Sequence, residues 1–219
     1  MRFGEASERL DAEFSPFVDE YLGEILEAVA VAWARMKPVK RRGLEDQITL
    51  ALVGRLRHDP ELATLPFDVV PQYWITDIDG RRLGRLDLYF KYPATRRDYF
   101  ALEAKRLHVR YPGGTISPEY SDYAGEPGMG AFIEGQYSRN LPAAGMFGYV
   151  MDGDTGKAWF GIAKRIATKS DDLQLTAELA ESGLAHHVRN GHPDTRLGET
   201  LHKLKTHCLR IFHLLLPVN

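Results

Sequence analysis

The chain contains a single cysteine, Cys208, so it cannot form a disulfide within itself. This scarcity is typical of proteins in a reducing compartment. Long apolar runs are also missing: the longest early stretch, residues 28–34, falls far short of the roughly 20 residues that a membrane-spanning helix needs. The first five residues carry no apolar segment of the kind found in signal peptides. We therefore expect a cytoplasmic protein with no membrane partner.

An excess of charge of either sign is missing as well. The 28 Lys and Arg residues face 30 Asp and Glu residues, which gives a net charge of −2. This balance excludes a protein coated with positive charge for binding nucleic acid, although it leaves room for a local basic cleft. Basic residues do cluster at 35–42, 81–85, 96–97 and 105–110. Taken one at a time, each cluster is typical of a solvated surface.

What is present is an ordinary globular composition. Hydrophobic residues make up 44% of the 219 residues, which is enough for a core of its own. Repeats and low-complexity tracts are absent from the sequence. A chain of this length is most simply one domain, so we predict a single domain over residues 1–219.

Two stretches show the periodicity of amphipathic helices. The first spans residues 16–37, where Ser15-Pro16 is typical of a helix start and Pro38 cannot continue the helix. The second spans residues 43–58, whose apolar residues recur on one side. Farther along the chain we expect helices at 131–139, 154–168 and 172–182.

The pattern between and after these helices is that of strands. We expect strands at 72–76, 83–91, 98–107, 144–151 and 207–218. Asp79-Gly80 predicts a type I′ turn between the first two strands. Residues 111–130, rich in glycine and proline, are expected to form a long loop. Cys208 lies in the apolar final run and is expected to be a buried thiol. The order of elements predicts an α/β or α+β domain with a central mixed sheet flanked by helices.

Charged side chains alternate with apolar ones along two neighbouring strands. The strand period places Arg85 and Asp87 on one face of the first, and Glu103 and Lys105 on one face of the second. If the turn between them is centred near Thr95, Asp87 lies opposite Glu103, with Cβ atoms roughly 5 Å apart. Two carboxylates so placed repel each other unless a cation lies between them. Their hard oxygen atoms suit Mg²⁺ or Mn²⁺.

The Glu103-Ala104-Lys105 triplet also has a second interpretation. An E-x-K triplet is common by chance, and an ion pair of Glu103 with Lys105 or Arg85 explains it without any site. The context favours a site, because strand-forming apolar residues flank the triplet and an aspartate is expected to face it.

These residues resemble the motif of the PD-(D/E)XK phosphodiesterase superfamily, which has the restriction-endonuclease-like fold. Asp87 is the first acidic residue, although it follows Leu86 instead of the proline of the motif, and Glu103-Ala104-Lys105 is the E-x-K half. The order helix, three strands, helix, strand also matches the family core, over about residues 43–151. The helix 16–37 and the C-terminal helices and strand are then additions to that core.

Two further positions match residues that this family often uses. Some members carry a glutamate on the helix before the sheet and a glutamine on the helix after it, and Glu45 and Gln136 stand there. The residues themselves place Glu45 beside the buried positions Ile48 and Leu52, where a carboxylate needs a partner. The alternatives are a helix N-terminal acid favoured by the dipole for Glu45 and a surface amide for Gln136. Asp46 is expected to be solvated.

The resemblance implies a metal-dependent endonuclease that hydrolyses phosphodiester bonds, most often in DNA, in a setting such as bacterial restriction or anti-phage defence. Asp87, Glu103 and Glu45 would hold Mg²⁺ or Mn²⁺, and Lys105 and Gln136 would complete the catalytic set. Basic side chains that would contact nucleic acid are Arg85, Lys91, Arg106 and Arg110. The resemblance also implies a homodimer as a possible assembly, and an activator or partner protein as a possible requirement.

Two other classes of protein fit the same residues. One is a catalytically silent nuclease-like module that binds nucleic acid or a partner protein. The other is a structural α/β subunit in which Glu103 and Lys105 form only an ion pair.

Overall fold

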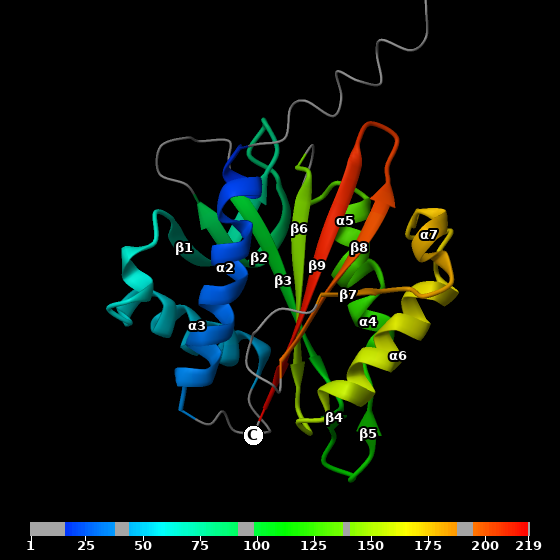
Figure 1. The fold of residues 1–219 in the computed structure, drawn as a ribbon, viewed down its shortest axis with the longest axis horizontal. Coiled ribbons are helices and arrows are strands. Elements are labelled where there is room, and N and C mark those ends of the chain that lie inside the picture. The colour runs from blue at the N-terminus through cyan, green and yellow to red at the C-terminus, as the bar shows by residue number, and fades with distance from the viewer. Residues whose placement is uncertain (1–15, 38–43, 92–98, 138–140, 188–194, 219) are drawn as a thin grey trace, which may run out of the picture.

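The computed structural model describes residues 16–37, 44–91, 99–137, 141–187 and 195–218. Within these residues the centre of the protein is a seven-stranded sheet (Figure 1). From one edge to the other its strands are β1 (Asp68–Thr76), β2 (Arg82–Lys91), β3 (Tyr99–Leu107), β6 (Ala143–Val150), β9 (Cys208–Pro217), β8 (Arg196–Lys203) and β7 (Ala185–His187). The neighbours β3, β6 and β9 are parallel and the other pairs are antiparallel. The predicted α/β class with a mixed central sheet is therefore confirmed.

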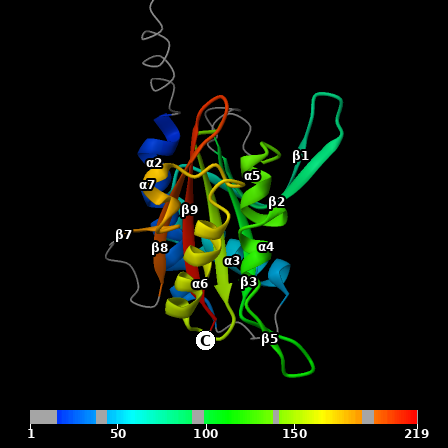
Figure 2. The ribbon, with the colours of Figure 1, turned by 90° about the vertical axis from the view of Figure 1, so that its right-hand side faces the viewer.

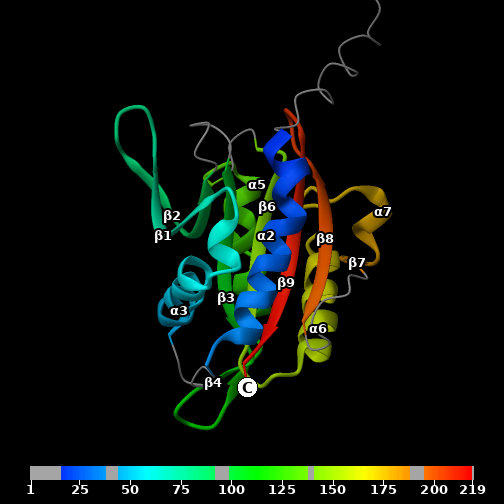
Figure 3. The same ribbon diagram turned by 60° about the vertical axis from the view of Figure 1, so that its left-hand side comes forward.

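Helices cover both faces of this sheet. On one face lie α2 (Pro16–Arg35) and α3 (Glu45–His58), followed by the short turn η1 (Leu62–Thr64) (Figures 1 and 3). The other face is covered by the short segments α4 (Tyr120–Tyr123), η2 (Glu126–Gly130) and α5 (Ala131–Ile133) and by the long helix α6 (Thr155–Thr168). The short helix α7 (Ala177–Ala180) follows α6 and buries none of its residues. Two hydrophobic cores result, one on each side, and every residue of β6 is buried between them.

The long helices begin and end close to where the sequence predicts. The helices α2, α3 and α6 match the expected ranges 16–37, 43–58 and 154–168, and the side chain of Asp154 caps α6 by accepting the Lys157 N–H at 2.8 Å. The two shorter predictions hold only in part: residues 134–137 of the range 131–139 are turns, with 138–139 outside the described residues, and only 177–180 of the range 172–182 are helical. The helix α5 ends early because Gly135 has a left-handed φ of 75°. Residues before α7 form turns instead, with the Leu175 backbone bridged to β8.

Three further predictions need correction. Residues 111–130 are not one loop, because β4 (Val109–Arg110) pairs with β5 (Ile116–Ser117) and the helical segments follow. The hairpin turn is not type I′, because Gly80 has a positive φ of 78° and Asp79 does not. The Asp77 carboxylate instead fixes this turn by accepting the backbone N–H groups of Asp79 and Arg81. Cys208 is exposed, because it is the first residue of β9 after the β8–β9 turn, where it pairs with Lys203.

The strand β8 was not predicted because its buried positions are not hydrophobic. Its inward side chains are those of Gly198, Thr200 and His202, so the alternation that normally reveals a strand is lost. The glycine is needed because the Trp159 ring from α6 packs where a Cβ atom would lie. Polar contacts and the packing of the Trp159 ring thus hold the strand in place, and neither gives a hydrophobic pattern in the sequence.

These polar contacts form a chain of hydrogen bonds inside the protein. His202 Nδ1–H donates to the Leu173 carbonyl at 2.7 Å, and His202 Nε2 accepts from the Thr200 hydroxyl at 2.7 Å. Thr200 Oγ1 in turn lies 3.0 Å from His213 Nε2, and His213 Nδ1 lies 3.0 Å from the Tyr123 hydroxyl. When both imidazoles are neutral, each hydrogen bond in this series has one donor and one acceptor.

The buried histidines make stability depend on pH. Burial lowers the pKa of His202 to about 4, and burial together with the nearby His202 lowers the pKa of His213 to about 3. The unfolded chain therefore binds more protons below pH 6.5, and each histidine removes about 1.4 kcal/mol of stability per pH unit down to its folded pKa. Urea midpoints measured from about pH 7 to about pH 4 should fall less steeply in His213→Phe than in the wild type. Equal slopes would contradict the account.

Candidate active site

The site lies where β2 parts from β3. The two strands pair from Leu88 with Leu102 to Lys91 with Tyr99, which confirms the predicted register for these residues. Among the described residues, β3 beyond Leu102 pairs only with β6, on its other side. The backbone N–H groups of residues 104 and 106 therefore face an edge that no strand covers.

Two carboxylates bind this open edge. Asp87 Oδ2 accepts the Ala104 N–H at 2.8 Å, and Glu45 Oε2 accepts the Arg106 N–H at 2.9 Å. Asp87 comes from the point where β2 departs, and Glu45 comes from the first residue of α3. The expectation that Glu45 needs a partner is thereby met, and the partner is the β3 backbone.

Glu103 and Lys105 project from β3 beside these carboxylates. Lys105 Nζ lies 2.6 Å from Glu103 Oε1, 3.0 Å from the Ala104 carbonyl oxygen and 3.9 Å from Glu45 Oε1. Glu103 is 5% exposed, and its second oxygen, Oε2, is buried without a hydrogen-bond partner. A buried carboxylate oxygen without a partner is costly, and such atoms need a specific explanation.

The crowding of these groups shifts their pKa values. Burial and the nearby Asp87 raise the pKa of Glu103 to about 8, and the Lys105 ammonium only partly opposes this. Burial also raises the pKa values of Asp87 and Glu45. Burial works to lower the pKa of Lys105, but the Glu103 and Glu45 carboxylates outweigh it and raise that pKa. The site thus holds a firmly charged lysine among carboxylates that resist ionisation.

Arg85 stands at the border of this group. Its guanidinium lies 3.3 Å from Asp46 Oδ2, so Asp46, expected to be only solvated, is half-exposed and paired. Of the other basic residues predicted to contact nucleic acid, Arg106 gives its backbone N–H to Glu45, Lys91 lies at the opposite end of β2, and Arg110 is exposed on β4.

Gln136 is not among the residues that the structure brings together. Its amide nitrogen donates to Glu134 Oε2 at 3.0 Å, and none of its described contacts reaches the carboxylates. The next residue, Tyr137, lies at the site instead: its ring packs on Gly84 and its hydroxyl accepts the Arg85 backbone N–H. Burial and the Glu103 charge raise the pKa of Tyr137. Sequence reasoning missed Tyr137, and the only signal for it was a glycine inside a strand, which often marks a close approach.

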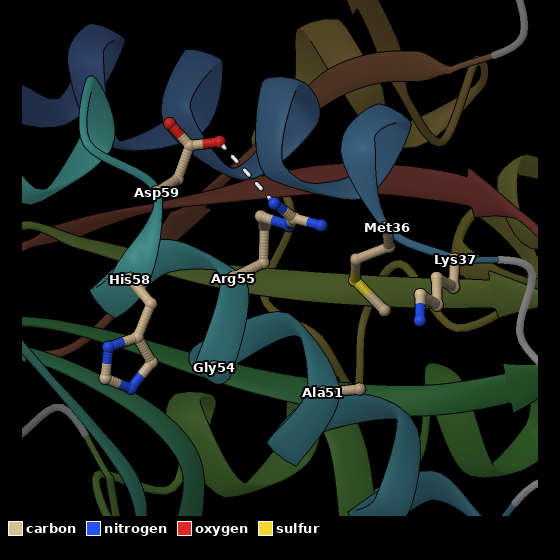
Figure 4. Close-up of a pocket in the computed structure, with 7 residues that line it drawn as sticks. All are labelled: Met36, Lys37, Ala51, Gly54, Arg55, His58 and Asp59. Atoms are coloured by element: carbon tan, nitrogen blue, oxygen red, sulfur yellow. Dashed lines mark ion pairs between the residues drawn. The ribbon is translucent and has the colours of Figure 1, made fainter.

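A separate pocket of about 450 Å³ opens between the end of α2 and the second half of α3 (Figure 4). Its lining residues are Met36, Lys37, Ala51, Gly54, Arg55, His58 and Asp59. The Arg55 guanidinium and the Asp59 carboxylate, 3.9 Å apart, form an ion pair there. None of the carboxylates of the candidate site lines this pocket.

Searches with the sequence and the structure found no matching family model, no matching curated protein and no matching solved structure. Within the described part of the chain, no helix is both long and apolar enough to cross a membrane. The function of the protein is therefore inferred from the geometry of the site.

The burial of Glu103 predicts an unusual effect of removing its charge. Its pKa of about 8 lies above the unfolded value of 4.5, so the penalty is absent below pH 4.5, grows as pH rises and is complete above pH 8. Without divalent ions, Glu103→Gln should raise the free energy of unfolding at about pH 7 by on the order of 3 kcal/mol, with little change at about pH 4.5.

Urea unfolding at the two pH values measures this difference, and the exposed Glu178→Gln serves as the control. If Glu103→Gln instead destabilises the protein at about pH 7, the contact of Glu103 with Lys105 is mainly structural and Glu103 is not held in place for a cation.

Proposed function

We propose that the protein is a metal-dependent nuclease that hydrolyses phosphodiester bonds, with DNA as its expected substrate. The observation that carries this proposal is the meeting of three carboxylates, from Glu45, Asp87 and Glu103, around the Lys105 ammonium at the open edge of β3. The resemblance to the PD-(D/E)XK superfamily points the same way, through the same residues.

The residues fit a hard divalent cation. Glu103 Oε2 is a buried oxygen without a hydrogen-bond partner. Glu45 and Asp87 each bind the β3 backbone through one carboxylate oxygen, so the second oxygen of each could bind a cation. An all-oxygen donor set suits Mg²⁺ or Mn²⁺. Within the described residues no three such side chains already surround one point closely enough to hold an ion. In the present arrangement Glu103 Oε1 contacts the Lys105 ammonium. We therefore expect the carboxylate side chains to shift slightly when a cation binds.

A bound cation of this kind would lower the pKa of water and stabilise negative charge on the scissile phosphate. Lys105 would orient that water or a phosphate oxygen through its Nζ. Because its pKa is raised, Lys105 stays charged at neutral pH, which favours electrostatic stabilisation over proton removal. Arg85 and Tyr137, at the border of the site, would contact the neighbouring phosphate.

The structural alternative explains less of this arrangement. The Glu103–Lys105 ion pair that it requires does form, at 2.6 Å. However, an ion pair alone gives no reason to place the Asp87 carboxylate nearby, where it raises the pKa of Glu103 and opposes the pair. A site that awaits a cation accounts for both features. The homodimer, the partner protein and the role in restriction or defence are implied by the resemblance alone and stay predictions.

The proposal is tested by incubating the purified protein with linear, circular and single-stranded DNA and with RNA, in Mg²⁺ or Mn²⁺. We expect metal-dependent cleavage that falls by about 10²–10³-fold or more in Asp87→Asn, Glu103→Gln and Lys105→Ala, because each removes a group that stabilises charge in the transition state.

Glu178→Gln, an exposed carboxylate on α7, is the control and should cleave as the wild type does. Cleavage that survives in Glu103→Gln would contradict the assignment. A wild-type protein that cleaves none of the four substrates with either ion would favour the silent binding module.

A further inference from the structure

Strands β1 and β2 continue past the rest of the sheet as a two-stranded arm, which we define as residues 73–86. Pairing of β2 with β3 ends at Leu88, whereas pairing of β1 with β2 runs on from Tyr73 with Leu86 to Thr76 with Arg82. Figures 2 and 3 show this hairpin pointing away from the body of the protein. Gln72, with a left-handed φ of 52°, lies at the base of the arm.

The arm carries exposed hydrophobic side chains out of proportion to its length. Four of the nine large hydrophobic residues that are exposed in the described part of the chain lie on it: Tyr73, Trp74, Ile78 and Leu83. Ile78, in the turn, is fully exposed. A two-stranded ribbon by itself is marginally stable in water, and clustered exposed hydrophobic groups mark interaction surfaces. We therefore expect the arm to contact another molecule.

Its charge indicates what kind of surface it contacts. Arg81 and Arg82 are exposed beside the turn, and no ion pair joins either to a carboxylate within the described residues. The Arg82 guanidinium lies 4.3 Å from the centre of the Trp74 ring, which holds it in place. The turn carries two acids, Asp79 and Asp77, whose carboxylate accepts two backbone N–H groups of the turn. The three arginines of the arm, at 81, 82 and 85, outnumber these two acids.

We propose that the arm enters a groove of double-stranded nucleic acid and holds it against the candidate active site; this inference rests on the proposed nuclease function. A two-stranded ribbon fits the major groove, arginines bind phosphates, and exposed apolar residues such as Ile78 contact sugars and base edges. The arm begins beside Asp87, so a duplex that it holds also reaches the carboxylates. From Asp87 to the turn the strand spans roughly 25 Å, or about seven base pairs.

The test measures duplex binding apart from cleavage. A fluorescein-labelled DNA duplex of about 25 base pairs, and one strand of it alone, are titrated by anisotropy in EDTA. We expect the wild type to prefer the duplex. The double variant Arg81→Ala/Arg82→Ala should lose about tenfold or more in affinity, and its slope of log K against log salt should be smaller by one to two.

A matched double variant controls for lost charge. Lys164→Ala/Lys203→Ala removes two exposed cations near the opposite edge of the sheet and should bind the duplex as the wild type does. Thermal unfolding of both variants confirms that they are folded. Ile78→Ser should weaken duplex binding without changing the salt slope, because it removes a contact that carries no charge.

Several results would overturn the inference. These are no binding of the duplex by the wild type, equal losses in the arm and control variants, or tighter binding of the single strand. A change from dimer to monomer in Trp74→Ser, with duplex binding intact, would instead make the arm a contact between two copies of the chain.

Hydrolysis of a small diester, bis(p-nitrophenyl) phosphate, tests the proposed function separately, because this substrate is too short to reach the arm. Hydrolysis that requires Glu103, together with duplex binding that does not require the arm, overturns only the inference about the arm. Duplex binding that requires the arm, in a protein without metal-dependent hydrolysis, overturns only the nuclease.

Discussion

The backbone of β3 beyond Leu102 presents N–H groups to an edge that no described strand pairs with, and carboxylates bind them. Asp87 and Glu45 take the positions that a β2 backbone would otherwise hold. This substitution joins α3, β2 and β3 at one place and fixes both carboxylates without using all of their oxygen atoms. The divergence of β2 from β3 is therefore the constraint from which both the site and the arm follow.

The same constraint concentrates negative charge where water is scarce. Glu103 is drawn into the group by its place on β3, and it is stabilised only by Lys105 on one of its two oxygens. Such an arrangement lowers the stability of the folded protein at neutral pH, as its raised pKa indicates. Strain of this kind is typical of functional sites, where a ligand relieves it.

Sequence reasoning reached the parts of the fold that repeat a hydrophobic pattern. The register that sets Asp87 and Glu103 near each other followed from the strand period and from an expected turn centred near Thr95, which lies outside the described residues, and the ladder from Leu88 onward agrees with it. Sequence reasoning did not find the elements whose buried positions are polar or small residues. The strand β8 buries Gly198, Thr200 and His202, and Tyr137 is placed by a glycine on another strand. Neither arrangement leaves a periodic signal in the sequence.

The most direct test of the account is a calorimetric titration of Mn²⁺ into the protein at about pH 7, repeated in buffers of different ionisation enthalpy. Glu103 is largely protonated there, so binding of the cation should release about one proton, seen as a heat that depends on the buffer. Glu103→Gln should abolish that release, and Asp87→Asn should weaken binding at least tenfold. No binding by the wild type, or binding that neither variant changes, would contradict the claim that these carboxylates form a metal site.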